Sequence, residues 1–420
     1  MATTVTPLDW APRGCAVCDA TDGRVLYPQR FAMMSEGSLF AGYDVVSCEA
    51  CGHCYADRIP PQSVFDRYYR EMSKYEGTTP AASAPAVSAF DRVRFARSVR
   101  LVERVAPQRD AFIFEIGCAT GVLLGQLQGV GYTNLSGLDP SPECARMARA
   151  SFNLPVRAGT LSDDLSDLPP VDVLILIGVL EHLRDLDTAL ITCRTLIAPG
   201  GHLLIAVPDA SRYPEGDDAP FQEFSVEHVN FFGPQSLVNL MARYGFRAVA
   251  MEQSLQRCDP VTITPVLHTM FERVEPDATQ QWTADETTVR ALERYVQACS
   301  LDDQRVRERL APYVLDRQPI IVWGAGTHTL RLLATGVLNT ANVRAVVDSN
   351  PRYHGKTIRG IPIIAPTDID GQSTPIVVSS RPAQRAIRRY IAKVMRLQNE
   401  VVVLYDLPER QHPVDPTPGT

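Results

Sequence analysis

Apolar runs alternate with amphipathic stretches in the middle of this chain, between residues 111 and 207. Four of the runs are almost continuously apolar, at 111–116, 135–138, 171–177 and 201–207. Parallel strands that are covered on both faces have this composition. The stretches between them, such as 144–152 and 186–196, carry apolar residues at helical spacing. The alternation predicts an α/β fold built on a doubly wound parallel sheet.

A second alternation follows a long helical pattern that runs from 283 to about 313. Its apolar runs lie at 320–323, 343–347, 375–379 and 401–404. A chain of 420 residues is long for a single core. We therefore predict three domains: a first segment with its linker at 1–85, the α/β domain at 86–255, and a helical connector with a Rossmann-like α/β domain at 256–420.

The charge balance sets limits on the partners. The chain has 41 basic and 48 acidic side chains, and its net charge of -7 offers no attraction to nucleic acid or to an anionic membrane. The longest apolar run, at 171–180, is too short to cross a bilayer, and the first residues lack a signal-peptide pattern. We expect a soluble, cytoplasmic protein with no nucleic-acid and no membrane partner. Ten cysteines are then more typical of ligands or buried thiols than of disulfides.

The first segment carries two C-x-x-C pairs about thirty positions apart: Cys15, Cys18, Cys48 and Cys51. Zinc binds four thiolates in a tetrahedron, and each pair supplies two of them. Four thiolates leave no open position for a catalytic water, so we predict a structural Zn²⁺ site that stabilises this segment. Two alternatives stay open: the pairs are redox or chance cysteines, or His53 or Cys54 replaces one ligand.

A glycine-containing turn follows the first strand of the α/β domain. It contains Glu115, Gly117 and Gly121 and opens a helix. Glycines let a ligand approach the backbone closely, and the N–H groups at a helix N-terminus favour an anionic group. The next strand ends at Asp139, 18 residues after Gly121, where an acid accepts hydrogen bonds from ribose hydroxyls. Each feature taken by itself has another explanation: the turn would also suit a nicotinamide dinucleotide, and Asp139 could be a helix cap.

Two further strand ends complete a recognisable order. Thr160 lies where the edge of an adenine would pass, and Gly178 precedes the sequence VLEHL with His182. The order E-x-G-x-x-x-G, LD, VLEHL and PGG resembles the class I methyltransferases. This resemblance implies that S-adenosylmethionine is the cofactor, with the carboxylate of its methionine moiety at the glycine turn.

Nearly the whole chain resembles a narrower group, the three-domain sugar C-methyltransferases, which act on nucleotide-linked keto-deoxysugars in antibiotic and surface-glycan pathways. The matching features are the two C-x-x-C pairs, the tyrosines around Ser73-Lys74-Tyr75, the methyltransferase motifs, Glu227-His228, Gly324-Ala325-Gly326, Ser379-Ser380-Arg381 and Leu404-Tyr405.

In that family the Glu-His pair lies at the substrate and the histidine is the favoured base. By motif, these are Glu227 and His228 here, with His182 as another active-site histidine and Tyr75 near the cofactor. Family members commonly carry a tyrosine where this chain has Ser225 in the predicted substrate site. The departure leaves the methylated atom open, and His228 can also be interpreted as a structural histidine that holds its loop.

The second Rossmann-like domain begins with a strand and the turn Gly324-Ala325-Gly326, but Thr329 replaces the third glycine of a dinucleotide fingerprint. One interpretation is that this turn binds a second cofactor. The resemblance implies instead that the domain helps to hold the nucleotide of the substrate, with Asp348 and Arg381 at strand ends as substrate-binding residues. Arg381 would meet a phosphate, or it is a solvated surface arginine.

The leading hypothesis is methyl transfer from S-adenosylmethionine to a carbon alpha to a ketone of a nucleotide-linked deoxysugar, a small-molecule substrate, with His228 as base. The first rival is an O- or N-methyltransferase acting on a sugar or another small natural-product intermediate. A non-catalytic binding protein built on a methyltransferase fold is a rival from another class. The zinc pairs also admit a nucleic-acid methyltransferase, against which the acidic net charge stands.

Overall fold

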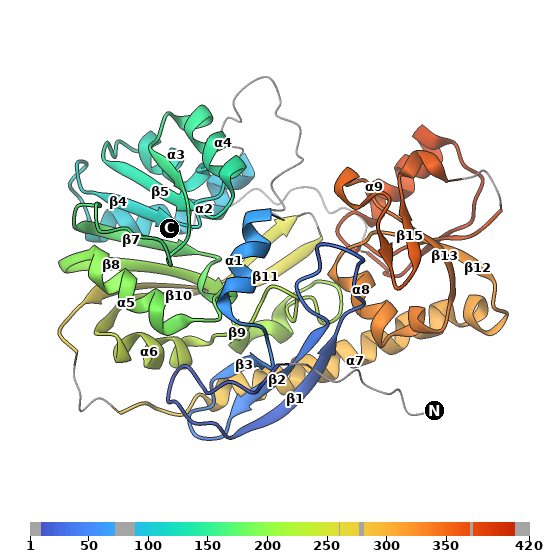
Figure 1. Ribbon diagram of the computed structural model, residues 1–420, viewed down its shortest axis with the longest axis horizontal. Coiled ribbons are helices and arrows are strands. Elements are labelled where there is room, and N and C mark those ends of the chain that lie inside the picture. Colours follow the sequence, from blue (N-terminus) through green and yellow to red (C-terminus); the bar gives the residue numbers. More distant parts are fainter. Residues whose placement is uncertain (1–9, 72–88, 260, 277–280, 370–372, 408–420) are drawn as a thin grey trace, which may run out of the picture.

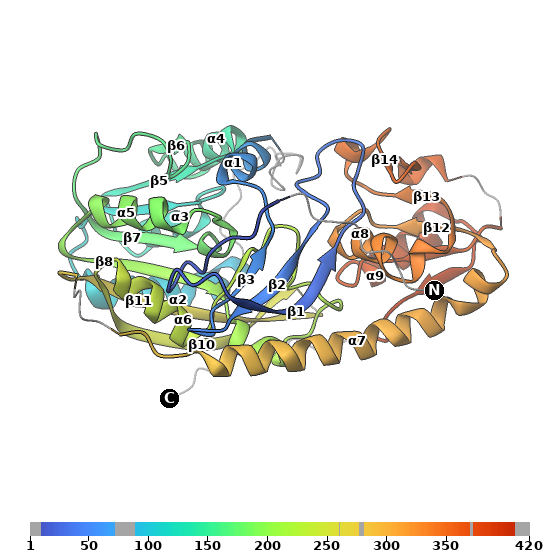
Figure 2. The ribbon, with the colours of Figure 1, turned by 60° about the horizontal axis from the view of Figure 1, so that its bottom comes forward.

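The computed structural model describes residues 10–71, 89–259, 261–276, 281–369 and 373–407 (Figure 1). Tyr75 and the end of the predicted first segment, residues 72–85, lie outside these ranges. The described residues form three sheets, joined along one side of the molecule by a helix of 30 residues, α7 (Glu286–Leu315). Figure 2 shows α7 running beneath all three sheets. Among these residues, no helix is both long enough and apolar enough to cross a membrane.

The largest sheet has seven strands in the order β10-β11-β8-β7-β4-β5-β6. Its parallel strands are β4 (Ile113–Ile116), β5 (Leu135–Asp139), β6 (Val156–Ala158), β7 (Val171–Ile177) and β8 (Ile197–Pro208). The helices around it are α2 (Ala89–Val105), α3 (Val122–Gly129), α4 (Pro142–Phe152), α5 (Leu186–Leu196) and α6 (Pro234–Arg243). An antiparallel hairpin, β10 (Phe246–Asp259) and β11 (Thr262–Arg273), extends the sheet beyond β8. The predicted α/β fold is confirmed, although the sheet is mixed and not wholly parallel.

Strand β7 shows why its sequence is continuously apolar. Val173 and Ile175 pack into the hydrophobic core on one face of the sheet, and Leu174 and Leu176 pack into the core on the other face. All four side chains are fully buried. The buried part of the strand therefore fixes the position of its half-buried end at Ile177 and of the backbone that follows.

The N-terminal sheet is antiparallel. It contains β1 (Gly23–Arg30), β2 (Gly42–Cys48) and β3 (Cys54–Asp57), and helix α1 (Gln62–Glu71) follows it. Its fourth strand, β9 (Asn230–Phe231), comes from the other side of the large sheet and pairs with β3. This pairing is important for function, because β9 begins two residues after His228.

The C-terminal sheet has six strands in the order β14-β15-β13-β12-β16-β17. The strands are β12 (Pro319–Trp323), β13 (Asn342–Val347), β14 (Thr357–Ile358), β15 (Ile361–Ile364), β16 (Ile376–Val378) and β17 (Val401–Val403), with helices α8 (Thr327–Ala334) and α9 (Gln384–Arg389). Short helical turns lie at η1 (Leu180–His182), η2 (Ala210–Glu215), η3 (Val337–Asn339), η4 (Pro351–Tyr353), η5 (Pro366–Asp368) and η6 (Tyr390–Met395).

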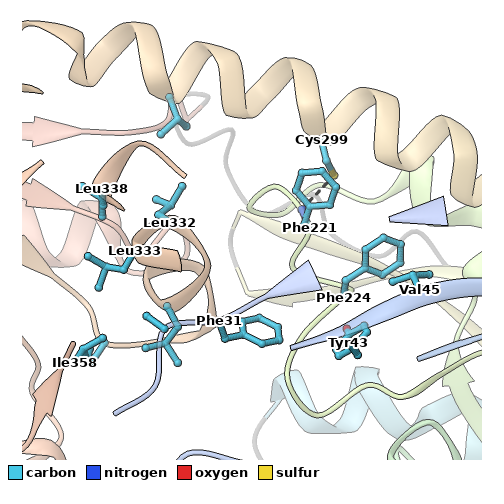
Figure 3. Packing of buried hydrophobic residues seen from close by; sticks show 14 of the residues in the cluster. Phe31, Tyr43, Val45, Phe221, Phe224, Cys299, Leu332, Leu333, Leu338 and Ile358 are labelled. Carbon is cyan, nitrogen blue, oxygen red and sulfur yellow. Dashed lines mark hydrogen bonds between the residues drawn. The ribbon is translucent and has the colours of Figure 1, made fainter. Parts of the chain in front are cut away.

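One hydrophobic core connects the N-terminal sheet, the 221–231 segment, α7 and the C-terminal sheet (Figure 3). In it, Phe224 packs edge-on against Phe231 and Tyr295, and the Cys299 thiol of α7 accepts a hydrogen bond from the Phe221 N–H at 3.2 Å. The predicted domain boundary at residue 255 lies inside β10. The domain limits stay predictions, but the continuous core couples the segments mechanically.

Candidate active site

A cavity of about 340 Å³ lies at the carboxyl ends of β4, β5, β6 and β7. Every segment that follows one of these strands contributes to its wall, as do α1 and the 227–228 segment. Its lining includes Gly117, Ala119, Asp139, Ser141, Gly159, Thr160, Ser162, Gly178, Val179, Glu181, His182, Gln62, Asp66, Tyr69, Glu227 and His228. The carboxyl edge of an open α/β sheet is where such folds bind their ligands.

The glycine turn after β4 has backbone angles that favour glycine at two positions. Gly117 has φ of 72°, and a β-carbon there would lie 2.5 Å from a methyl carbon of Val179. Gly121 has φ of 76° and begins α3, but it does not line the cavity. A β-carbon on Gly121 would lie 2.9 Å from that of Ala148 on α4. Gly117 therefore shapes the cavity wall, whereas Gly121 allows close helix packing behind it.

Asp139 fixes the geometry of this turn. Its Oδ2 accepts a hydrogen bond from the Ala119 N–H at 2.8 Å, and its Oδ1 accepts one from the Ser141 N–H at 2.9 Å. The carboxylate is thus held against the turn after β4 while it borders the cavity. Thr160 borders the cavity as well, with its N–H donated to the Asp163 carboxylate at 2.6 Å.

Glu115 lies beneath the turn and is almost completely buried. Its Oε2 has no hydrogen-bond partner among the described residues. Burial, with a contribution from the Asp139 carboxylate, raises the pKa of Glu115 to about 8. Glu115 does not line the cavity, so its carboxyl lies behind the turn and not at the cavity wall.

We expect the pH dependence of stability to report this buried carboxyl. Between about pH 5 and pH 8, Glu115 keeps its proton in the folded protein but loses it on unfolding, so the free energy of unfolding falls as pH rises. Glu115→Gln, which never ionises, should flatten that fall when melting temperature is measured from pH 5 to pH 8.5 without ligand. The exposed change Glu308→Gln serves as control, and an equal slope in both variants would contradict the assignment.

Two histidines meet at the far end of the cavity. Nδ1 of His182 lies 2.9 Å from the Glu227 carbonyl oxygen, and Nδ1 of His228 lies 3.1 Å from the Glu223 carbonyl oxygen. A carbonyl oxygen only accepts, so each neutral ring carries its proton on Nδ1 and has its basic lone pair on Nε2. The two ring centres are 5.0 Å apart.

Two acidic residues next to these rings, Glu181 and Glu223, were not predicted from the sequence as site residues. Oε1 of Glu181 lies 3.9 Å from Nε2 of His182, and Oε2 of Glu223 lies 3.9 Å from Nδ1 of His228. Burial, with the nearby Asp218 and Glu181 carboxyls, raises the pKa of Glu223 to about 8. The only sequence signal for these acids is their distance along the chain, one residue before His182 and five before His228.

The 225–230 segment is fixed by local and long-range contacts. The Ser225 hydroxyl accepts hydrogen bonds from the N–H groups of Glu227 and His228, at 3.3 and 3.2 Å. The Asn230 side chain donates to the carbonyl oxygens of Leu180 and Leu183, on both sides of His182. Ser225 does not line the cavity. It orders the turn that carries the Glu-His pair.

A buried arginine connects this segment to the N-terminal sheet. The Arg13 guanidinium donates hydrogen bonds to the carbonyl oxygens of Ala56 and Val229 and to Oδ1 of Asn230, at 2.9, 2.6 and 2.9 Å. Desolvation by burial lowers the pKa of Arg13 to about 9. Arg13 lies two residues before Cys15, so the cysteine pairs are joined closely to the segment that carries His228.

Glu227 stands at the junction of two cavities. A second cavity of about 130 Å³ is lined by Glu227, Tyr68, Tyr353 and the turn Ala325-Gly326-Thr327, together with residues of the loop after β1. The Tyr68 hydroxyl donates a hydrogen bond to Oε1 of Glu227 at 3.0 Å. A molecule that reaches from the first cavity into the second must therefore pass Glu227.

The second glycine turn copies the hydrogen bonds of the first. Oδ2 of Asp348 accepts from the Ala325 N–H and Oδ1 accepts from the Asn350 N–H, both at 2.8 Å. The Thr329 hydroxyl donates to the Gly324 carbonyl oxygen at 2.6 Å, so this turn is closed by a side chain where a fingerprint has glycine. Asp348 itself lines neither cavity.

Arg381 also lines neither cavity. Its buried guanidinium donates to the carbonyl oxygens of Asp217 and Val261 and pairs with the Asp217 carboxylate. The predicted contact between Arg381 and a substrate phosphate has no support in this geometry, because the donors are engaged in joining the C-terminal sheet to residues 217–261. The alternative interpretation, a solvated surface arginine, does not hold either, because the Arg381 side chain is buried.

The four predicted zinc ligands lie together. The Sγ atoms of Cys15 and Cys51, and those of Cys18 and Cys48, are 3.5 Å apart, and all four lie within 4.8 Å of one another. Sulfur atoms around a tetrahedral zinc are separated by roughly 3.8 Å. His53 and Cys54 do not belong to this group: His53 is stacked against Tyr55 and Phe232.

Two of these thiols differ in acidity. A hydrogen bond with Cys51 lowers the pKa of Cys15 to about 6, whereas burial raises the pKa of Cys18 to about 12. Four thiolates in one place require a dication, which the residues are arranged to hold.

Comparison with known proteins assigns the class. Residues 90–251 match the family model described as "Methyltransferase domain". With the sheet order and the glycine turn, the match places this part of the chain among the class I S-adenosylmethionine-dependent methyltransferases, a family of enzymes. The match is limited to this domain, so the resemblance of the flanking segments to sugar C-methyltransferases stays a prediction.

Particular relatives agree with the class and differ in substrate. The O-methyltransferase cnsE of Penicillium expansum is 27% identical over 158 residues, which are 35% of this chain and 55% of that protein. A tRNA U34 carboxymethyltransferase of Cellvibrio japonicus is 25% identical over 159 residues, 36% of this chain and 49% of that protein. A solved methyltransferase of Methanosarcina mazei has 15% identity and a TM-score of 0.35, over 41% of this chain and 97% of that one. The chain thus spans about half the length of the curated relatives it matches.

Proposed function

We propose that this protein transfers a methyl group from S-adenosylmethionine to a carbon alpha to the ketone of a nucleotide-linked deoxysugar, with His228 as the base. The observation that carries the proposal is the continuity of the site. The cavity that begins at the glycine turn ends at His182 and His228, and Glu227 at that end also borders the cavity at the second glycine turn.

The residues at the turn suit the cofactor. The backbone of the turn at Gly117 and Ala119, which lines the cavity, suits the amino-acid end of the cofactor, and the buried Glu115 lies behind this turn. Asp139 holds the turn through hydrogen bonds from the backbone and borders the cavity, where the ribose hydroxyls of the cofactor would donate to it. Thr160 and Gly178 border the space for the adenine and the reactive centre. Tyr75 keeps its predicted place near the cofactor, outside the described residues.

When bound, S-adenosylmethionine supplies a methyl group on a sulfonium leaving group. His228 removes the proton alpha to the ketone through Nε2, while the Glu223 carbonyl oxygen accepts a hydrogen bond from Nδ1–H and keeps the ring oriented. The electron pair of the broken C–H bond forms the enolate, and this carbon then bonds to the methyl group. His182 forms the opposing wall and keeps the reacting carbon in line.

The second cavity favours a substrate in two parts. The sugar would lie against the histidines, and its nucleotide would reach past Glu227 to the turn Ala325-Gly326-Thr327 at the N-terminus of α8. Backbone N–H groups at such a turn favour phosphate oxygens. Asp348 contributes by holding the turn in shape.

The cysteine cluster is proposed to hold a structural Zn²⁺ ion, and the sulfur separations support this proposal. Four thiolate ligands would leave no coordination position for a catalytic water. Its function would be to fix the N-terminal sheet, and through Arg13 and β9 the segment that carries His228.

Methylation of an oxygen or nitrogen is the second candidate. It is favoured by the O-methyltransferase among the relatives and by Ser225, which turns the backbone and supplies no group to the cavity. In this reaction His228 would remove the proton of a hydroxyl or amine.

Product analysis separates the two candidates. The purified protein is incubated with S-adenosylmethionine and a panel of nucleotide-linked keto-deoxysugars, beginning with dTDP-4-keto-6-deoxyglucose, and with the matching sugars that lack the ketone. Mass spectrometry should show one added methyl group only with the keto-sugars. In deuterium oxide, exchange at the carbon alpha to the ketone is expected for carbon methylation. Methylation of the ketone-free sugars without exchange would establish the second candidate instead.

A further inference from the structure

Helix α1 presents one face to the large cavity. Gln62, Asp66 and Tyr69 line that cavity, and their spacing of four and three residues places them on one side of the helix. The helix is anchored, because Oε1 of Gln62 accepts hydrogen bonds from the N–H groups of Arg184 and Asp185, at 2.7 and 3.0 Å. These residues directly follow the turn with His182, so α1 and the histidine keep a fixed separation.

The Tyr69 side chain packs between an aromatic neighbour and a histidine. Its ring lies edge-on to His182 with centroids 5.8 Å apart, and edge-on to Tyr68 with centroids 5.4 Å apart. Two neighbouring tyrosines therefore serve different cavities. Tyr68 lines the second cavity and donates to Glu227, whereas Tyr69 lines the first cavity beside the histidines.

The Tyr69 hydroxyl is inaccessible to solvent and has no hydrogen-bond partner among the described residues. Burying a hydroxyl in this way costs free energy, and buried tyrosines usually find a partner. By contrast, the Tyr132 hydroxyl donates to the Ala106 carbonyl oxygen at 2.6 Å and the Tyr43 hydroxyl donates to the Ser225 carbonyl oxygen at 2.8 Å. Within the part of the chain that the structure describes, the Tyr69 hydroxyl is thus a donor without a partner.

The surroundings keep this hydroxyl protonated. Burial, together with the carboxylates of Glu227 and Glu181, raises the pKa of Tyr69 well above its usual value. A neutral phenol next to a histidine base is suited to donate to an oxygen on which negative charge develops.

We propose that Tyr69 is a further catalytic residue, whose hydroxyl donates a hydrogen bond to the substrate oxygen that becomes negatively charged when the neighbouring carbon loses its proton. The assignment rests on the proposed function. His228 takes the proton, the C–H electron pair forms the enolate double bond, and the oxygen carries the charge against Tyr69. When the carbon bonds to the methyl group and the methyl–sulfur bond breaks, the ketone forms again and the hydrogen bond weakens.

The test is Tyr69→Phe, which removes one oxygen atom and keeps the ring against His182. With dTDP-4-keto-6-deoxyglucose as substrate, we expect kcat to fall by about 100-fold or more. Deuterium exchange at the carbon alpha to the ketone, measured without S-adenosylmethionine, should fall by a similar factor. The affinity for S-adenosylhomocysteine, measured by calorimetry, and the melting temperature should not decrease, because the hydroxyl stabilises nothing in the ligand-free fold.

Tyr132→Phe is the matched control. It removes a hydroxyl that has a structural partner, so it should lower the melting temperature and leave kcat within about twofold. The assignment is overturned if Tyr69→Phe keeps wild-type rates of exchange and methylation, or if it lowers stability as Tyr132→Phe does. Exchange by the wild-type protein is measured first. Methylation by the wild type without any exchange would contradict the proposed carbon acceptor, and not the role of Tyr69.

Discussion

His228→Gln is expected to lower kcat by about 100- to 10,000-fold, the range for loss of a general base. Glutamine approximates the size of histidine and can still donate to the Glu223 carbonyl, but it cannot take up a proton. The loss should therefore appear in kcat, with little change in the affinity for S-adenosylhomocysteine. Steady-state kinetics by mass spectrometry and calorimetry measure the two quantities.

The control for this prediction is His202→Gln, at a histidine in the middle of β8 that lines neither cavity. Its activity should equal that of the wild type. If His228→Gln keeps more than about a tenth of the wild-type kcat, then His228 is the structural histidine considered as the alternative, and His182 becomes the first candidate for the base.

Cys48→Ser is expected to have the largest effect on stability. Removal of one thiolate from a four-sulfur site should abolish zinc binding and destabilise the protein by at least about 3 kcal/mol. Zinc content by atomic emission, melting temperature and methyl transfer would be measured together. Cys258→Ser, at an exposed cysteine outside the cluster, is the control and should change none of them.

The same variant should lose activity even though the cluster does not line the cavity. The reason is the path from Cys15 to Arg13, and from Arg13 to the Val229 carbonyl oxygen one residue after His228. The pairing of β9 with β3 gives a second path. A Cys48→Ser protein without zinc that keeps wild-type stability and activity would contradict both the metal site and its proposed structural role.

The sequence predicted the strands that are buried on both faces. The run at 171–177 is β7 and the stretch at 186–196 is α5, each with the observed limits. These elements are decided by local composition, because a continuous apolar run bounded by a turn has one favourable environment. The last helix, α9, continues directly into a π-helical turn at Tyr390–Met395.

The contacts between segments were not predictable in the same way. Nothing in the residues Asn230–Phe231 indicates that they join the sheet of Cys54–Asp57, because strand pairing at long range leaves no local pattern. For the same reason the sequence gave no role to Arg13 or Glu223, whose importance lies in their partners 216 and five residues away. The hairpin of β10 and β11 was also missed, since β10 does not alternate polar and apolar residues regularly: residues 248–251 are all apolar.

The same distinction applies to the residues of the candidate site: local spacing predicts some of them, and only the structure explains the others. Glu115, Gly117 and Asp139 could be found from their spacing, since the chain order of strand, turn and helix fixes their positions. Arg381 shows the limit of that reasoning. A strand end brings a residue near the ligand edge of a sheet, but only the structure shows that its guanidinium is engaged by Asp217 and Val261.

A crystal structure of the protein grown with S-adenosylhomocysteine tests the central claim most directly. The account predicts the amino-acid end of this ligand against Gly117 and both ribose hydroxyls within hydrogen-bond distance of Asp139. Its thioether sulfur should face His182 and His228. Ligand density elsewhere on the molecule, or density in this cavity with the ribose turned away from Asp139, would contradict the account.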